Sequence, residues 1–298
     1  MVKRLAIALT MILSLAGAGT VQEDAKMRST VLRQGVGYAV YLPPGYEEDS
    51  RAYPVIYLLH GAVDGQPADW FRFVAIDRLL DRLIAEGRIP PVIAIAPDGR
   101  RNEENLPATY FLDDADGGFE WERMFITEFV PYVERRYRAI VGTEARMMLG
   151  ISMGGFAATV YQLRYPDMFG GAAVLSGAFR TDTEMTQMAQ PPYERRFAGA
   201  FGAGLEGEAR LNEAYRRSDP VAMAATAQTS QQMGFGFWFD IGADDPFFAG
   251  NAAMHIALRD AGIAHRFRVG HGKHDWQYWD DALEPALLFL SDRMRRRE

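Results

Sequence analysis

The sequence predicts an α/β fold, with a mostly parallel central sheet and helices on both of its faces. Short apolar runs alternate along the chain with longer amphipathic segments, which is the pattern of repeated β–α–β units. Fully apolar runs are typical of strands buried on both faces. The predicted strands are 55–59, 92–96, 147–149, 172–176, 237–241 and 266–269.

Helical periodicity fills the intervals between these runs. In 74–86, Ile76, Leu79, Leu80 and Leu83 recur at spacings of three and four residues, and Gly87 is placed to cap the end. Further helices are expected at 119–137, broken or kinked by Pro131, at 249–261, and at 276–296, interrupted early by Pro285.

The N-terminus has the pattern of a secretory signal peptide. Lys3 and Arg4 precede the apolar segment 5–18, which ends in the small residues 16–20. The segment is shorter than the roughly 20 residues of a spanning helix, although an uncleaved membrane anchor is the alternative. We therefore expect a signal peptide at 1–25, cleaved between 18 and 25, and a secreted or periplasmic protein without stable membrane insertion.

The mature chain, 26–298, is predicted to form one domain. It should begin with a hairpin of extended segments within 29–42. Residues 181–232 have no strand pattern and are rich in Met, Ala, Arg and Gly, which indicates a mostly helical insertion over one end of the sheet. The 298 residues are 48% hydrophobic, enough for a large core.

Composition also excludes several classes of function. The net charge is −7 and the body has no basic stripe, which argues against a nucleic-acid partner. Without cysteine, disulfides, thiol nucleophiles and thiolate metal sites are impossible. The 5 histidines lack the spacing of metal ligands, and no glycine-rich phosphate loop follows a strand. We expect neither a metal nor another cofactor.

A G-x-S-x-G pattern at 150–154 is the feature around which the site is predicted. An apolar strand leads into it and a small-residue helix leads out, which is the context of a nucleophile elbow. Such a turn lifts the hydroxyl of Ser152 clear of the sheet. The flanking glycines are needed because side chains there would collide with the neighbouring strand and helix.

Two later strand ends carry the partners that a serine nucleophile needs. Asp244 and Asp245 follow strand 237–241, and His271 and His274 follow strand 266–269. Active sites of parallel sheets lie at the carboxyl ends of strands, so a base and its carboxylate can meet the serine there. The order Ser, Asp, His is that of the α/β-hydrolase fold.

Two backbone N–H groups are predicted to stabilise the oxyanion. Elbow geometry provides that of Met153. The loop after strand 55–59 provides the other, from Ala62 or alternatively from Gly61. His60 in this loop is expected to order the loop rather than to catalyse. Trp70 and Tyr110, in polar loops near strand ends, are the predicted substrate-binding residues.

Several segments together resemble the esterase D family of α/β-hydrolases; they are 43–46, 58–61, 150–155, 242–247 and 272–276. That family includes S-formylglutathione hydrolases, feruloyl and acetylxylan esterases, and the antigen 85 mycolyltransferases. The resemblance covers nearly the whole mature chain. It implies that Asp245 is the acid and His274 the base. Ala62 departs from the family, where leucine is frequent, and predicts a roomier acyl pocket.

The predicted function is a secreted serine esterase. His274 would activate Ser152, an acyl-enzyme would form, and water would hydrolyse it. The resemblance and the predicted export suggest an acetyl or feruloyl ester of a carbohydrate. The alternatives are an acyltransferase of the antigen 85 type, with a sugar hydroxyl as acceptor, and a non-catalytic carbohydrate-binding protein on a hydrolase scaffold.

Overall fold

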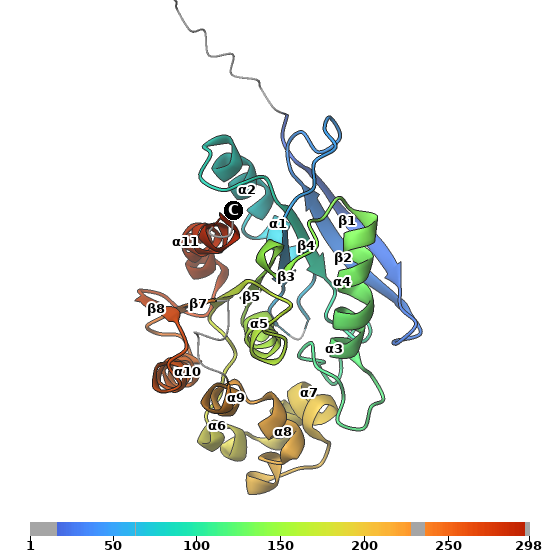
Figure 1. The fold of residues 1–298 in the computed structure, drawn as a ribbon. Helices are drawn as coiled ribbons and strands as arrows, with labels where there is room; N and C mark the ends of the chain where they lie inside the picture. Colours follow the sequence, from blue (N-terminus) through green and yellow to red (C-terminus); the bar gives the residue numbers. More distant parts are fainter. Residues whose placement is uncertain (1–16, 63, 228–235, 296–298) are drawn as a thin grey trace, which may run out of the picture.

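A single mixed sheet forms the centre of the computed structural model, which describes residues 17–62, 64–227 and 236–295 (Figure 1). The strand order is β1-β2-β4-β3-β5-β6-β7-β8. The two N-terminal strands pair antiparallel, β2 is antiparallel to β4, and all other neighbours are parallel. The strands are β1 Thr20–Arg28, β2 Gly35–Leu42, β3 Val55–Leu59, β4 Ile93–Pro97, β5 Arg146–Ile151, β6 Gly171–Leu175, β7 Gly236–Gly242 and β8 His265–Gly270.

The predicted fold class is confirmed by this sheet and by the helices that cover it. Every residue of β3, β4, β6 and β7 is buried, as the continuous apolar runs predicted. β8 lies at an edge and alternates between half-buried and exposed residues. The parallel strands bring the carboxyl ends of β3, β5, β6, β7 and β8 to one side of the molecule, where the predicted site residues follow them.

Helices cover both faces of the sheet and divide the core into two clusters. One cluster packs α1 Asp69–Arg72, α2 Ile76–Ala85 and α11 Trp276–Arg295 against side chains such as Ile56 and Leu58 of β3. The other packs α3, the π-helical turn η1, α4, α5 and α10 against the alternate residues of the same strands, such as Tyr57 and Leu59. These elements are α3 Trp121–Met124, η1 Phe125–Phe129, α4 Val130–Arg136, α5 Met153–Arg164 and α10 Phe248–Asp260.

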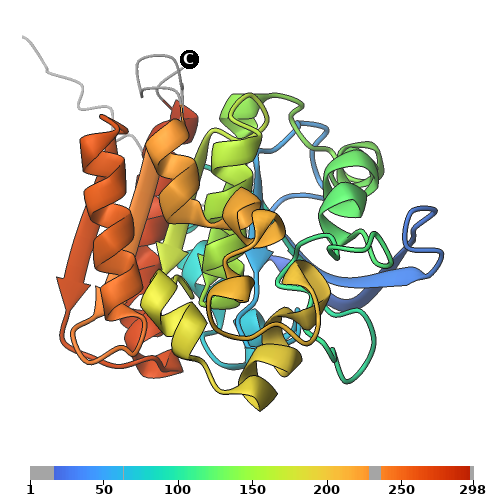
Figure 2. The same ribbon diagram turned by 90° about the horizontal axis from the view of Figure 1, so that it is seen from below.

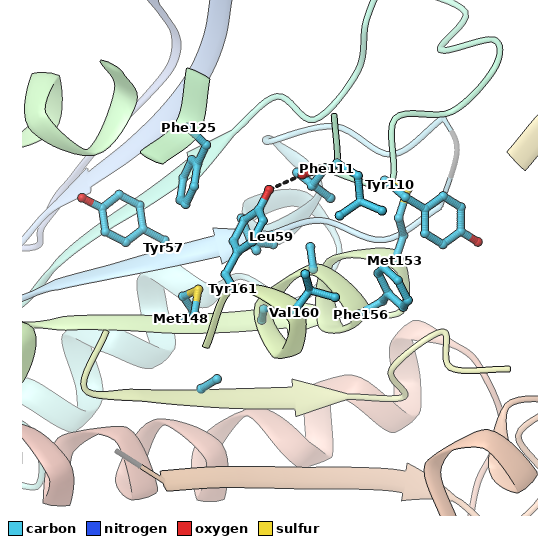
Figure 3. Close-up of a cluster of buried hydrophobic side chains, with 14 of the residues drawn as sticks. Tyr57, Leu59, Tyr110, Phe111, Phe125, Met148, Met153, Phe156, Val160 and Tyr161 are labelled. Carbon is cyan, nitrogen blue, oxygen red and sulfur yellow. Dashed lines mark hydrogen bonds between the residues drawn. The ribbon is translucent and has the colours of Figure 1, made fainter. Parts of the chain in front are cut away.

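Figure 3 shows the second cluster around Tyr161 of α5. Its ring stacks on Phe125 with centroids 5.4 Å apart, and its hydroxyl donates a hydrogen bond to the carbonyl of Phe111. Tyr161 thereby ties the loop before α3 to the helix that follows the elbow. A buried hydroxyl needs such a partner, so this contact fixes the loop that carries Tyr110.

Two of the predicted helices contain a proline. The helical segment has no break at Pro131, which lies in the first turn of α4, but its geometry changes from π-helix to α-helix directly before the proline. Pro285 does not interrupt α11, which runs without a break from Trp276 to Arg295. The apolar face of α11 is buried on both sides of the proline, at Ala282, Leu283, Ala286 and Leu287, and this packing outweighs the missing backbone hydrogen bond.

The N-terminal segment differs most from the sequence analysis. Residues 20–28 form β1, so the turn lies at 29–34 and the first half of the predicted hairpin 29–42 is not a strand. The proposed end of the signal peptide at residue 25 falls inside β1, whose Thr20 and Val21 pair with Leu42 and Tyr41. Residues 1–16, which hold most of the predicted signal, lie outside the described residues.

The segment between β6 and β7 folds mostly as short helices, grouped at one side of the sheet (Figure 2, yellow to orange). They are α6 Asp182–Gln187, α7 Gln190–Phe201, the 3₁₀ turn η3 Gly207–Arg210, α8 Glu213–Ser218 and α9 Pro220–Thr226. A further 3₁₀ turn, η2 Thr143–Ala145, precedes β5. The insertion contacts the main body through α9, which packs on α5 and α10, and through α7, where the carbonyls of Arg195 and Gly199 accept the N–H groups of Ala108 and Ala115. Its last predicted residues, 228–232, lie outside the described part.

Candidate active site

Ser152 lies at a sharp turn between β5 and α5. Its backbone has φ 54° and ψ −113°, a strained conformation for a residue with a side chain. The turn depends on its glycines: a Cβ on Gly154 would lie 2.0 Å from the carbonyl oxygen of Leu59, and one on Gly150 would lie 2.2 Å from that of Gly154. The N–H of Ser152 donates to the carbonyl of Leu175 at 2.9 Å, which ties the turn to β6.

The structure brings Ser152, His274 and Asp245 into one hydrogen-bonded chain. His274 Nε2 lies 2.9 Å from Ser152 Oγ, and His274 Nδ1 lies 2.8 Å from Asp245 Oδ2. Asp245 Oδ1 accepts the N–H of Phe247 at 2.8 Å, so both carboxylate oxygens are used. The Asp245 side chain is completely buried and that of His274 is 22% exposed. Nδ1–H therefore donates to the carboxylate, and Nε2 is left to accept the serine proton.

The rival residues of the sequence analysis do not join this chain. Asp244 and His271 are both exposed. Neither makes a side-chain hydrogen bond or ion pair within the described residues. The N–H of Asp244 donates to the carbonyl of Gly272 at 3.0 Å, which holds the two loops of Asp245 and His274 side by side.

Two aromatic rings fix the orientation of His274. Phe247 and Trp279 each meet the imidazole edge to face, with ring centroids 4.9 Å apart. Trp279 is in turn held by a hydrogen bond from its Nε1–H to Ser176 Oγ at 3.0 Å. Ser176, at the end of β6, has φ 50° and donates its N–H to the carbonyl of Asp240 on β7 at 2.8 Å.

The predicted oxyanion donors, the N–H groups of Ala62 and Met153, both belong to residues that line the cavity above Ser152. Met153 is the first residue of α5, where backbone N–H groups have no intrahelical acceptor. Neither N–H group has an acceptor within the described residues. Ala62 adopts φ 60°, and Gly61 approaches the elbow so closely that a Cβ there would lie 3.2 Å from Ser152 Cβ.

His60 is completely buried behind this loop. Its Nε2 accepts the N–H of Gly99 at 2.9 Å, so the proton is on Nδ1, which lies 3.0 Å from the carbonyl of Gly61. Burial lowers the pKa of His60, which keeps the ring neutral. The imidazole has no contact with the triad and instead links the loops after β3 and β4.

Comparison with known proteins places this arrangement in a family. A family model described as "Putative esterase" matches residues 29–290. The chain belongs to this esterase family. The resemblance to esterase D-like α/β-hydrolases is thereby confirmed.

Individual relatives agree with this placement. The chain is 26% identical over 264 residues to the esterase Rv1288 of Mycobacterium tuberculosis, which covers 84% of this chain. It spans only about half, 54%, of the length of that relative. A solved ferulic acid esterase superposes with a TM-score of 0.78 at 29% identity, covering 93% of this chain and 99% of that one. An S-formylglutathione hydrolase from Agrobacterium tumefaciens gives 0.71 at 18% identity, covering 93% and 96%.

A cavity of about 1050 Å³ opens over the triad of this esterase-family chain. Of the two predicted substrate-binding residues, Tyr110 lines it and Trp70 does not. Trp70, a residue of α1, is completely buried in the core, so its prediction as a pocket residue is wrong. The polar loop around it suggested a surface position, but the single turn of α1 directs Trp70 inward and leaves Phe73 at the cavity, 57% exposed.

Other lining residues were not predicted. Trp276 stacks on Phe73 with centroids 4.9 Å apart and forms an aromatic rim. Its position two residues after His274 is a signal that could have found it. Arg180, Arg195 and Arg196 line another part of the cavity. They belong to no motif, and only the path of the chain brings them to the site.

No group of three or more potential metal-ligating side chains occurs within the described ranges. Over the same residues, no helix is both long and apolar enough to cross a membrane.

Proposed function

We propose that this protein is a serine esterase that hydrolyses carboxylic esters through an acyl-enzyme. The observation that carries the proposal is the continuous hydrogen-bonded chain from Ser152 Oγ through His274 to the buried Asp245. Family membership supports it independently. A serine hydroxyl is a weak nucleophile until a neighbouring base accepts its proton, and this chain provides that base in the correct tautomer.

The reaction follows from this geometry. His274 Nε2 takes the proton of Ser152 as Oγ attacks the ester carbonyl carbon. The carbonyl oxygen becomes an oxyanion and accepts the N–H groups of Met153 and Ala62. When the tetrahedral intermediate collapses, the C–O bond to the alcohol breaks and the alcohol leaves with the proton from His274. Water then repeats the sequence on the acyl-enzyme and releases the acid. Asp245 stabilises the imidazolium at both stages.

The test combines active-site labelling with turnover. A fluorophosphonate probe should add once to the protein, at Ser152, and p-nitrophenyl acetate should be hydrolysed. Ser152→Ala should abolish labelling and lower turnover by about 10⁴-fold or more, with an unchanged circular-dichroism spectrum. Hydrolysis at the wild-type rate by folded Ser152→Ala would refute the mechanism. Absence of an adduct on folded wild-type protein would instead favour a non-catalytic, carbohydrate-binding role.

For the substrate we propose an acetyl or feruloyl ester of a carbohydrate. The likeness to a ferulic acid esterase supports an aromatic acyl group. The exposed Phe73, stacked on the half-buried Trp276 at the cavity rim, supports a flat aromatic or sugar ring at this position. A panel of acetyl, feruloyl and longer acyl esters, each with and without an acceptor alcohol, separates hydrolysis from acyl transfer, because a transferase diverts product to the acceptor.

We further propose that the protein is exported. The charged residues Lys3 and Arg4 and the apolar segment 5–18 support this. The N–H of Gly19 donates a hydrogen bond to Asp81 at 3.0 Å and residues 20–28 form β1, so cleavage that leaves this bond and the whole of β1 in place lies before Gly19. Ala16, Gly17 and Ala18 suit such a cleavage site. N-terminal sequencing of the protein from a secreting host should begin at Gly19, and a mature protein that begins after Ala25 would contradict this.

A further inference from the structure

The cavity over Ser152 has a cationic wall made of Arg180, Arg195 and Arg196. Arg180 follows β6, on the segment that leaves the strand end near the triad. Arg195 and Arg196 are neighbours on α7 of the insertion. Three arginine residues thus line the space in which a substrate must lie. The side of the cavity formed by the segment after β6 and by α7 therefore carries positive charge in a protein whose net charge is −7.

None of the three has a carboxylate partner within the described residues. No carboxylate oxygen of those residues lies within 4.0 Å of their nitrogens. Several other arginines do have carboxylate partners, among them Arg101 with Asp114 at 2.8 Å and Arg216 with Asp182 at 2.6 Å. The positive charge of the wall is therefore available to a ligand.

Arg180 is held in place without being neutralised. Its guanidinium lies over the rings of Phe247, at 4.7 Å, and Phe197, at 5.0 Å. Its Nη1 donates to the carbonyl of Ala178 at 3.2 Å and to the hydroxyl of Tyr110 at 3.3 Å. Arginine has five N–H donors, and those on Nε and Nη2 have no acceptor among the described residues. Phe247 also contacts His274, so the ring of Phe247 lies between the Arg180 guanidinium and the catalytic base.

The negative charges of the cavity come from other elements. Asp64 and Asp69 lie on the loop after β3 and at the start of α1, and Asp275 precedes α11. Asp69 accepts the N–H of Gln66 at 2.8 Å and Asp275 accepts that of Tyr278 at 3.0 Å, so both serve as local backbone acceptors. None of these carboxylates pairs with the arginines. The cavity is thus divided by charge, with its cations on the β6 and α7 side.

We infer that the cavity selects an ester that carries a carboxylate on its acyl or alcohol part, bound by Arg180 together with Arg195 and Arg196. This inference rests on the proposed esterase function and names a substrate class for it. The carboxylate replaces the water around the free N–H groups of Arg180 with charge-assisted hydrogen bonds and places the ester carbonyl at Ser152. The neighbouring arginines on α7 attract the anion and add to its affinity.

Two matched pairs of esters test this directly. For the acyl side, the mono-p-nitrophenyl ester of adipic acid, whose free carboxylate is too far away to form a five- or six-membered anhydride, is compared with the p-nitrophenyl ester of monomethyl adipate. For the alcohol side, 4-acetoxybenzoate is compared with its methyl ester. Each kcat/KM is divided by the hydroxide-catalysed rate of the same ester, which removes differences in intrinsic reactivity. In at least one pair the anionic ester should be preferred roughly tenfold, and the preference should shrink as salt rises from 0.05 to 0.5 M.

Variants assign the preference to the wall. Arg180→Gln should lower the ratio of anionic to neutral kcat/KM roughly tenfold, and Arg196→Glu should reverse the preference. Because Arg195 is exposed, the double variant Arg195→Gln/Arg196→Gln keeps the test valid if Arg180→Gln does not fold. Arg217→Gln is the matched control, an exposed arginine of α8 in the same insertion that does not line the cavity, and should leave both ratios unchanged.

The outcomes separate this inference from the proposed function. If neutral esters are hydrolysed in a Ser152-dependent manner but neither anionic ester is preferred, the carboxylate inference is overturned and the esterase stands. A preference that survives in all the arginine variants also overturns it. If no ester is hydrolysed and no fluorophosphonate adduct forms, the esterase function fails, and the inference with it.

Discussion

Arg210 holds the helical insertion together, and its replacement should loosen the wall of the cavity. The side chain is 2% exposed and stacks 4.3 Å from the ring centroid of Tyr193 on α7. It donates to the carbonyls of Leu205 at 2.9 Å, Met185 at 3.0 Å and Met188 at 2.5 Å, and to the side-chain oxygen of Gln190 at 2.7 Å. No carboxylate shares this site within the described residues, so the guanidinium satisfies only neutral acceptors.

The cost of Arg210→Met follows from these contacts. A buried acceptor left without a donor costs about 1–3 kcal/mol; the carbonyl of Met185 is buried, and the other three acceptors are part-buried and cost less each. Methionine carries no charge, so the variant avoids the several kcal/mol that it costs to desolvate the guanidinium on folding. The net loss in the free energy of unfolding is therefore about 3 kcal/mol. For a domain of this size that corresponds to a fall in Tm of about 6–12 °C if the protein unfolds as one unit. If the insertion opens separately, the same loss appears there as faster amide exchange.

Thermal unfolding and hydrogen exchange by mass spectrometry measure both possibilities. Peptides from α6 to α9 should lose protection in Arg210→Met, whereas those of β3 and β5 should not. The exposed Arg217→Met is the control and should leave Tm within about 1 °C of the wild type. If Arg210→Met also stays within that limit and exchanges like the wild type, the reasoning that Arg210 organises the insertion is refuted.

Two further predictions concern pH and catalysis. Burial raises the pKa of Asp113 from 3.8 to about 6, so the folded state disfavours the ionised carboxylate and loses stability as pH rises through about 6. Asp113→Asn should therefore raise Tm more at pH 7.5 than at pH 5. An equal rise at both pH values would contradict this. Trp279→Phe keeps a ring against His274 but loses the hydrogen bond to Ser176, so kcat should fall roughly tenfold with little change in KM. Adding Ser176→Ala to Trp279→Phe should lower kcat almost no further, because both changes remove the same hydrogen bond. Additive losses in kcat would contradict this.

The central sheet and its elbow could be predicted because each depends on a short, continuous stretch of sequence. Buried strands need continuous apolar runs, and the turn at Ser152 needs glycine on both sides, since Gly150 and Gly154 lie against backbone carbonyls. Nothing local distinguished β1, however. Its residues Thr20–Arg28 are mostly polar and exposed, and only the pairing with β2 makes them a strand.

The walls of the cavity were harder to predict because they depend on the direction in which each side chain points as well as on its position in the sequence. Trp70 and Phe73 lie three residues apart, yet one is completely buried and the other exposed at the cavity. Arg180 lies on a connection that no motif marks. Its place beside Phe247 results from the meeting of segments that follow β6 and β7, which only the folded chain reveals.

The backbone bonds at the strand ends have a consequence for how activity appears during synthesis. Ser152 is tied to Leu175 of β6, and Ser176 is tied to Asp240 of β7, so each position is set by a strand that is made later. The base comes later still, after β8. A nascent chain that has exposed its nucleophile therefore has neither the final turn nor a proton acceptor, and it is chemically inert towards esters around it. Activity therefore requires that the last strands have joined the sheet.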